Sequence, residues 1–219
     1  MTVRHAMLRC TRGATAAEFA MVLPLLMLLL FGIMDAGRWL WTVNKAEKAT
    51  QVGARMAIVT NVLAPGLIAE DYAGQNYGPG GAALKSGDLI PAEALGVVRC
   101  NSDGCACETA PCPDPIGDPD ATTFAAIVER MQLMYPDIVP ANVEVRYSGS
   151  GLGSAGALPA TGPGGGPAPA EAIEISPLIT VSLRNMTFKP MTTFLMTDFA
   201  MPDFKTTMTA EDVSGIYSS

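Results

Sequence analysis

The strongest pattern in the sequence is an uncharged apolar run near the N-terminus. It covers residues 19–34 and reads FAMVLPLLMLLLFGIM. As a helix this run would be about 24 Å long, shorter than the roughly 30 Å hydrocarbon core of a bilayer. Extending the helix gives about 34 Å and places Trp39 and Trp41 where interfacial aromatic residues gather. The pattern therefore predicts a membrane-spanning helix over residues 14–41.

Two other interpretations fit an apolar run of this kind. A basic leader before an apolar segment is also typical of a secretory signal peptide, but no small-x-small cleavage site follows. A buried helix of a soluble protein is the other alternative, and the Leu density and basic leader disfavour it. The first 13 residues hold Arg4, Arg9 and Arg12 and no acid. This bias predicts a cytoplasmic N-terminus and an extracytoplasmic C-terminal domain.

Residues 42–65 continue the helical pattern as an amphipathic extension. Apolar residues recur every three or four positions until Pro65 and Gly66, which should stop the helix. The apolar positions are Val43, Ala46, Ala49, Val52, Met56, Val59 and Leu63. This face would pack onto the sheet of its own domain, the interpretation we favour, or against partner helices. The whole helix would be near 70 Å long.

The remaining residues, 66–219, predict one α+β domain. Residues 66–120 are rich in Gly, Pro, Asp and Ala, which favours loops with short helical turns. A helix is expected over residues 122–135, and apolar alternation predicts strands after it. The strand positions are Val143, Val145 and Tyr147; Ile173, Ile175, Ile179, Val181 and Leu183; and Phe204, Thr206 and Met208. A long helix followed by a small antiparallel sheet is the expected architecture.

A Gly- and Pro-rich linker over residues 148–170 separates the first two strand regions. It contains Gly151, Gly153 and Gly156 at the spacing of the dinucleotide-binding fingerprint. The helix that must follow that fingerprint is replaced by Pro and Gly, so no nucleotide site is expected.

Composition narrows the function further. The chain has 219 residues and a net charge of -7, and after Gly13 eleven Lys and Arg stand against 21 Asp and Glu. Without a basic surface to neutralise phosphates, nucleic-acid binding is not expected. The one histidine, His5, lies in the leader, so the rest of the chain lacks an imidazole for acid–base work. We therefore expect no enzyme and no catalytic residue.

Four of the five cysteines lie in a Cys-rich loop over residues 99–113, as Cys100, Cys105, Cys107 and Cys112. Their even number predicts two disulfides and an oxidising compartment. A zinc site is the alternative, but Cys-x4-Cys-x-Cys-x4-Cys lacks the usual spacing within each pair. Of the three pairings, the one that joins Cys105 to Cys107 is least favoured, because a one-residue gap strains the bridge.

Asp114, Asp118 and Asp120 follow this loop and could gather oxygen atoms around calcium. Their spacing does not match the twelve-residue calcium loop, so we expect a solvated turn. No metal and no cofactor is predicted.

The start of the helix carries a short motif. Gly13 stands five residues before Glu18, and Glu18-Phe19 leads into the apolar run with Pro24 inside it. This combination resembles the N-terminus of the TadE-like pseudopilins of tight-adherence (Flp-type) pili, closely over roughly residues 12–60. The resemblance implies that a prepilin peptidase cuts between Gly13 and Ala14 and removes the leader, residues 1–13.

The same resemblance implies a function and partners. The chain would be a minor pseudopilin of the bacterial inner membrane, with a pilin-like domain that serves pilus assembly, adhesion or secretion. Its partners would be the lipid bilayer, the prepilin peptidase, other pilins or pseudopilins and the assembly platform. Glu18 would pair with the new α-amino group of a neighbouring subunit; alternatively it sits in the headgroup region near the helix N-terminus. A membrane-tethered extracytoplasmic binding or adhesion module is the alternative function.

Overall fold

The chain forms two compact units. The computed structural model describes residues 11–156, 173–191 and 197–210. The N-terminal unit comprises residues 1–43 and 187–200, and the sheet unit comprises residues 44–186 and 201–219. The predictions for most of the leader and for most of the Gly- and Pro-rich linker lie outside the described residues.

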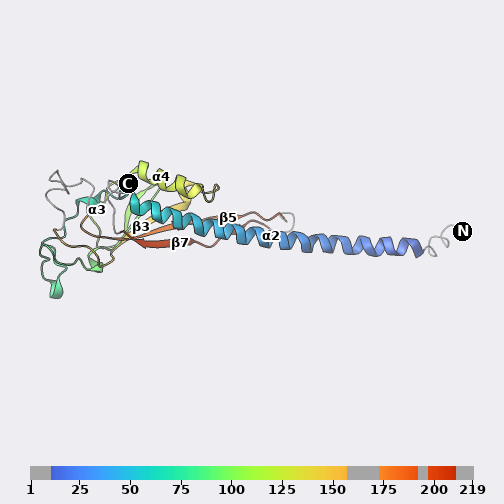
Figure 1. Cartoon of the computed structure of the whole chain (residues 1–219), viewed down its shortest axis with the longest axis horizontal. Coiled ribbons are helices and arrows are strands. Elements are labelled where there is room, and N and C mark those ends of the chain that lie inside the picture. Colours follow the sequence, from blue (N-terminus) through green and yellow to red (C-terminus); the bar gives the residue numbers. More distant parts are fainter. Residues whose placement is uncertain (1–10, 157–172, 192–196, 211–219) are drawn as a thin grey trace. The chain divides into compact units, whose positions relative to one another are not determined.

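Helix α2 (Thr11–Val59) is continuous through 49 residues and contributes to both units (Figure 1). Its first half is rich in Leu and Met, which favour helix. Pro24 lies inside it and removes one backbone donor without ending the helix. The predicted long N-terminal helix is therefore confirmed.

The C-terminal end of α2 differs from the prediction. The helix ends at Val59, so the expected continuation to Pro65 is wrong. The Thr60 N–H makes a last helical bond to the Met56 carbonyl at 3.1 Å, and the Thr60 hydroxyl donates to the same carbonyl at 2.8 Å. A few residues on, the backbone N–H of Leu63 donates to the side chain of a sheet residue rather than to a helical carbonyl.

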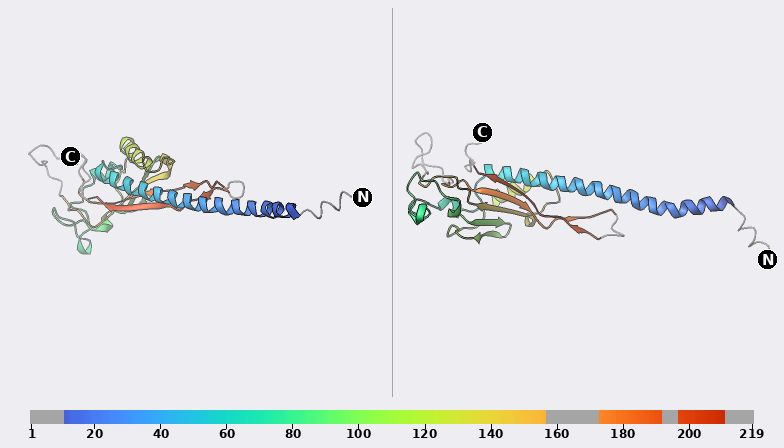
Figure 2. Two further views of the ribbon diagram at one scale, coloured as in Figure 1. Left: turned by 45° about the vertical axis from the view of Figure 1, so that its right-hand side comes forward. Right: turned by 90° about the horizontal axis from the view of Figure 1, so that it is seen from below.

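The sheet unit contains one five-stranded antiparallel sheet (Figure 2). In spatial order its strands are β2 (Gly104–Thr109), β1 (Val97–Asn101), β3 (Val143–Ser148), β4 (Leu178–Leu183) and β7 (Phe204–Thr209). Strands β3, β4 and β7 fall where apolar alternation predicts them. The α+β class with a small antiparallel sheet is confirmed.

Two local predictions for the sheet unit are wrong. Residues 97–109, expected to be loop, form the β1–β2 hairpin. Ile173 and Ile175, expected in a strand, lie outside β4, and Ile175 makes only an isolated bridge to Gly153. In β2 most side chains are exposed, so this strand shows no apolar alternation that sequence reasoning could detect.

The shorter elements complete the fold. In the sheet unit they are α3 (Gly66–Ala69), η1 (Pro79–Gly81), η2 (Ala92–Ala94), α4 (Ala121–Gln132) and η3 (Pro140–Asn142). In the N-terminal unit they are β5 (Thr187–Phe188) and β6 (Phe199–Ala200), which pair as an antiparallel ribbon. The helix predicted over residues 122–135 is confirmed as α4, with a slightly earlier end.

The C-terminal part of α2 packs onto the sheet and α4 through small residues. Its buried positions are Ala46, Ala49, Thr50, Gly53, Ala54 and Ala57. The Thr50 and Thr206 hydroxyls lie 2.9 Å apart, and a Cβ on Gly53 would lie 2.7 Å from the Met131 Sδ. Packing onto the domain's own sheet is thus confirmed, but the face is rotated from the predicted one. Val59, a predicted member, is exposed.

Candidate membrane and assembly site

The N-terminal part of α2 presents a surface unlike that of a soluble helix. It is the only helix of the described residues that is long and apolar enough to span a membrane, and its apolar window is not buried at all. The helix exposes its own large apolar side chains on all sides. They include Phe19, Met21, Val22, Leu25, Leu26, Leu29, Leu30 and Ile33. Contiguous apolar surface of this extent marks a membrane or partner contact. The helix indicates a single-pass membrane protein.

The residues of the predicted assembly motif stand at the start of this surface. Gly13 and Ala14 lie within α2. Glu18 and Phe19 follow on the same helix, and both side chains are exposed. No ion pair joins Glu18 to another residue within the described ranges. Its carboxylate is therefore presented outward, where a group from another molecule could reach it.

A buried carboxylate lies at the other end of the apolar surface. Asp35 is 8% exposed and accepts a hydrogen bond from the Met191 backbone N–H at 2.7 Å. Its Oδ1 also lies 3.2 Å from Nη1 of Arg38, one helical turn further on. The acid is thus held by a backbone donor and a guanidinium, which offset the cost of removing it from water.

An aromatic contact joins the same two segments of the N-terminal unit. The Phe188 ring meets Trp39 edge to face with 5.3 Å between ring centroids, and the Arg38 guanidinium lies 5.5 Å from the Phe188 centroid. Together these contacts attach the β5–β6 ribbon to residues 35–39 of α2. Sequence reasoning missed this attachment, because Asp35 and Met191 are 156 residues apart and no local pattern links them.

The four predicted cysteines form two disulfides, Cys100–Cys105 and Cys107–Cys112. The first bridges directly opposed residues of β1 and β2, and the second ties β2 to the segment that follows it. The disfavoured pairing of Cys105 with Cys107 does not occur. Each bridge closes a short loop, and chain-entropy arguments give about 2 kcal/mol of stabilisation for a loop of this size.

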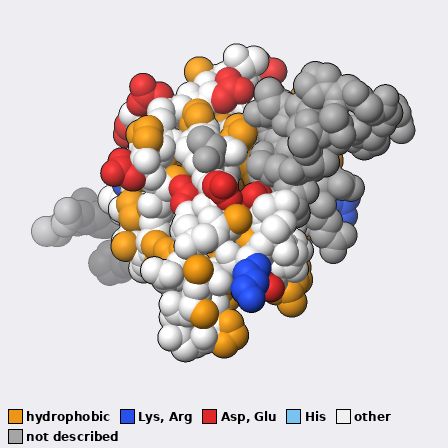
Figure 3. Space-filling model, turned by 90° about the vertical axis from the view of Figure 1, so that its left-hand side faces the viewer, with side chains coloured by type: hydrophobic (Ala, Val, Ile, Leu, Met, Phe, Trp, Pro, Cys, Tyr) orange, Lys and Arg blue, Asp and Glu red, His pale blue; other side chains and the backbone are white. Residues whose placement is uncertain are grey.

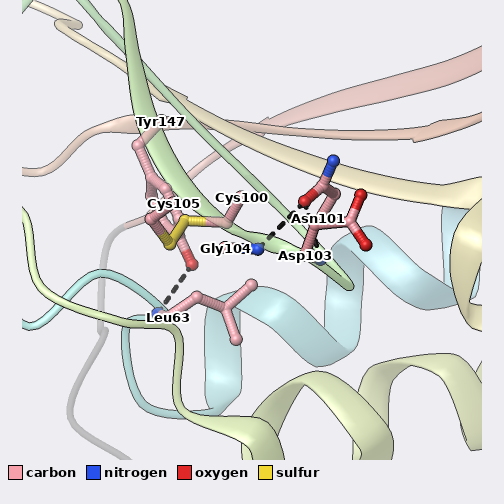
Figure 4. The surroundings of a disulfide bond; sticks show 7 residues. All are labelled: Leu63, Cys100, Asn101, Asp103, Gly104, Cys105 and Tyr147. Carbon is pink, nitrogen blue, oxygen red and sulfur yellow. Dashed lines mark hydrogen bonds between the residues drawn. A yellow bond between two sulfur atoms is a disulfide. The ribbon is translucent and has the colours of Figure 1, made fainter.

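The turn of the β1–β2 hairpin is closed by Asn101. Its side-chain oxygen accepts hydrogen bonds from the backbone N–H groups of Asp103 and Gly104, at 2.9 and 3.1 Å (Figure 4). This Asx-type arrangement fixes the turn locally. Bridge and turn together hold a hairpin whose second strand buries little apolar surface.

The inner end of the first disulfide faces the core. Cys100 is fully buried, and the Tyr147 side chain lies beside the bridge in Figure 4. The Tyr147 hydroxyl accepts the Leu63 N–H at 3.1 Å. Burial raises the pKa of Tyr147 far above its ordinary value, so the hydroxyl stays neutral. This contact links the segment after α2 to the sheet.

The three aspartates that follow the cysteines have different surroundings. Asp114 and Asp118 are exposed, whereas Asp120 is the N-cap of α4. Its carboxylate accepts from the Thr122 N–H at 2.9 Å and the Thr123 hydroxyl at 2.7 Å. These hydrogen bonds, that of the Thr123 side chain above all, lower the pKa of Asp120. The capping role accounts for Asp120 without a calcium ion.

The outer face of the sheet carries a charge network around Glu144. This residue is 5% exposed, and its carboxylate lies 3.6, 3.0 and 3.2 Å from the guanidinium groups of Arg99, Arg146 and Arg184. Further ion pairs extend the network to Glu108 and Asp203. Several of these atoms lie within ion-pair distance but lack an aligned hydrogen bond. The arginines are therefore satisfied inside the sheet unit, and they do not form a free basic patch.

The distribution of charged side chains on the surface also argues against a free basic patch. On the face drawn in Figure 3, acidic side chains occur at several places and basic ones gather in few. That face offers no basic stripe of the kind that binds a phosphate backbone.

These features define a class: a single-pass membrane protein with a disulfide-bonded α+β domain. Comparison with known families then identifies the N-terminal segment, because the model described as "TadE-like protein" matches residues 13–55. The match includes Gly13, Glu18, the apolar run and the buried Asp35. It confirms the resemblance to TadE-like proteins and indicates a protein associated with tight-adherence pili. No curated protein and no solved structure matches the chain.

Proposed function

We propose that this chain is a minor pseudopilin-like structural protein for the assembly of a tight-adherence pilus. The observation that carries the proposal is the position of an exposed carboxylate, Glu18, at the start of the exposed apolar surface, within the segment that matches TadE-like proteins. The chain would sit in the bacterial inner membrane with its N-terminus in the cytoplasm and its sheet unit outside. Its role would be structural and not enzymatic.

Maturation would begin with removal of the leader. A prepilin peptidase would cut between Gly13 and Ala14, so that Glu18 becomes the fifth residue of the mature chain. The mass of the mature N-terminus tests this directly, because a start at Ala14 is expected. An intact Met1 in cells that contain the peptidase would instead favour the second candidate.

Substitution of Gly13 sharpens the same test. Gly13→Leu places a bulky side chain beside the scissile bond and should make the precursor accumulate, whereas Thr11→Leu should be processed normally. Normal processing of Gly13→Leu would refute the leader assignment.

Assembly would depend on Glu18. Its carboxylate would pair with the α-amino group of a neighbouring subunit within the membrane, where an unpaired charge costs several kcal/mol. Glu18→Ala should keep its membrane level, because removal of an acid favours insertion. Co-purification with other pilins and with the assembly platform should fall. Retained association and pilus formation in Glu18→Ala would reduce Glu18 to an interfacial charge.

The second candidate is a membrane-tethered extracytoplasmic binding or adhesion module. The β1–β2 hairpin favours it, because two disulfides stiffen a strand that exposes most of its side chains. In that case the hairpin would carry the activity and leader processing would be dispensable. A Gly13→Leu variant that remains unprocessed but still supports surface attachment would favour this candidate over the pseudopilin.

A further inference from the structure

The β5–β6 ribbon has no role in the proposed assembly chemistry, and its placement is unexpected. It is contributed by residues 187–200, between strands β4 and β7 of the sheet, yet it clusters with the N-terminal unit. Its contacts with α2 fall at Asp35, Arg38 and Trp39, the end of the apolar surface. A segment far along the chain thus returns to the level where the helix leaves the membrane.

The direction of the ribbon follows from its two contacts. Phe188 meets Trp39, and three residues later the Met191 amide meets Asp35. Asp35 lies four residues before Trp39 on the helix, which is about 6 Å closer to the middle of the apolar run. From Phe188 to Met191 the chain therefore runs along the helix toward the membrane interior.

Among the described residues, the ribbon exposes two large apolar side chains. Met191 is 54% exposed and Phe199 is 41% exposed, while Phe188 is buried against the helix. The sequence carries no charge between Lys189 and Asp198. Exposed Leu40 and Trp41 continue the apolar surface on the helix itself. Ribbon and helix together present one apolar surface at this level.

The polar groups of the ribbon are arranged as a bilayer interface requires. The Met191 N–H is satisfied by the Asp35 carboxylate, and β5 and β6 pair with each other. Satisfaction of backbone donors is the main condition for placing non-helical chain at membrane depth. The ladder ends with the pair Phe188 and Phe199, and the same register continued by one step would place Lys189 opposite Asp198. These opposite charges would lie at headgroup level beside the Trp and Arg belt.

We propose that the β5–β6 ribbon is a second membrane contact, inserted into the interfacial layer of the bilayer beside the spanning helix. The occupant of its exposed face is lipid. The inference rests on the proposal that α2 spans the membrane, and it adds a second membrane contact made by a segment distant in sequence. Asp35 is the positioning residue, because it holds the ribbon through the Met191 amide.

The test uses the full chain in vesicles of phosphatidylethanolamine and phosphatidylglycerol. Cys10→Ser removes the thiol outside the two disulfides, and Met191→Cys then carries a nitrobenzoxadiazole label attached without reductant. A second variant carries the label through Phe199→Cys, in case one position perturbs the ribbon. Quenching is measured with lipids that bear a doxyl group at carbon 5 and, separately, with aqueous iodide.

Two control positions make the outcomes distinct. Met27→Cys reports on the spanning helix, and Leu133→Cys reports on the sheet unit, where Leu133 is 65% exposed. Labels at positions 191 and 199 should show blue-shifted emission, at least twofold quenching by the doxyl lipid, and weaker iodide quenching than at position 133.

Two results would overturn the inference while leaving the span intact. With position 27 quenched by lipid, iodide quenching at 191 and 199 equal to that at 133 would place the ribbon in water. Protection from both quenchers would place it against another protein, such as a second copy. If position 27 escapes lipid quenching as well, the spanning helix itself is refuted and the inference fails with it.

Discussion

The two parts of α2 show how one helix is adapted to two surroundings. In the N-terminal unit its large apolar side chains point outward, and no part of the described chain buries them. In the sheet unit its small residues, among them Ala46, Gly53 and Ala57, point inward and are buried. The outward surface suits lipid, which tolerates bulk, whereas the inward surface suits a close approach to the sheet and α4. Side-chain size, and not apolarity alone, separates the two environments.

The largest expected effect is the loss of folding stability when a bulky side chain is added to the part of α2 that packs on the sheet. Gly53→Leu should destabilise the sheet unit by about 3 kcal/mol, since overpacking a close contact forces backbone shifts. A Cβ there would already lie 2.7 Å from Met131 Sδ and 3.2 Å from a Val181 methyl. Gly32→Leu is the matched control, because a Cβ on Gly32 has nothing within 4 Å. Urea unfolding of the full chain in detergent, followed by circular dichroism, measures both.

The comparison fails if the two variants lose similar stability. Equal loss would mean that the N-terminal part of α2 is as closely packed as the sheet unit. A Gly32→Leu variant that unfolds normally but loses association with other pilus proteins would instead locate a helix–helix contact on the outward surface.

The sequence predicts those elements of the fold that carry a local or periodic signal, and it misses those that do not. Positions whose environment repeats along the chain were predictable: the apolar run, α4, and the alternating residues of β3, β4 and β7. That four neighbouring cysteines form two disulfides was also predictable, whereas the sequence left open which of the two favoured pairings occurs. The hairpin strand β2 was not, because its exposed residues lack the period of a buried face.

Contacts between distant segments account for the other misses. Just beyond the end of α2, the Leu63 amide donates to the Tyr147 hydroxyl, which comes from a strand 84 residues away. Glu144 gathers arginines from three parts of the chain, and Asp35 is held by Met191. Such contacts are determined by topology, and a single sequence carries no periodic signal for them.

A second prediction concerns how the N-terminal unit holds its ribbon. Asp35→Ala removes the acceptor of the Met191 N–H, and a hydrogen bond to a charged group contributes roughly 1.5 to 3 kcal/mol. Exchange of the Met191 amide with deuterium should accelerate roughly 10- to 100-fold, as that energy implies. Asp118→Ala is the control, because that exposed acid lies outside the ribbon and no described hydrogen bond or ion pair involves it.

Peptide-resolved exchange of the detergent-solubilised chain provides the measurement. Unchanged protection at Met191 in Asp35→Ala would mean that the aromatic contact between Phe188 and Trp39 holds the ribbon alone. Faster exchange at α4 as well would indicate general unfolding and not release of the ribbon.

The smallest effect concerns the start of a helix in the sheet unit, where a side-chain cap supplies acceptors for the first backbone N–H groups. Asp120 caps α4 through the Thr122 amide and the Thr123 hydroxyl. Asp120→Ala should cost about 1 kcal/mol at neutral pH. Asp120→Asn keeps an accepting oxygen and should cost less.

The pH dependence separates charge from hydrogen bonding at this cap. Because the folded-state pKa of Asp120 is lowered, its ionisation stabilises the fold fully above the unfolded pKa of about 4, and this contribution is lost as pH falls through the folded pKa. The stability gap between the native chain and Asp120→Asn, measured by urea unfolding, should therefore narrow as the pH is lowered below about 4. A gap that stays constant over that range would show that the cap acts through geometry alone, with no contribution from the charge.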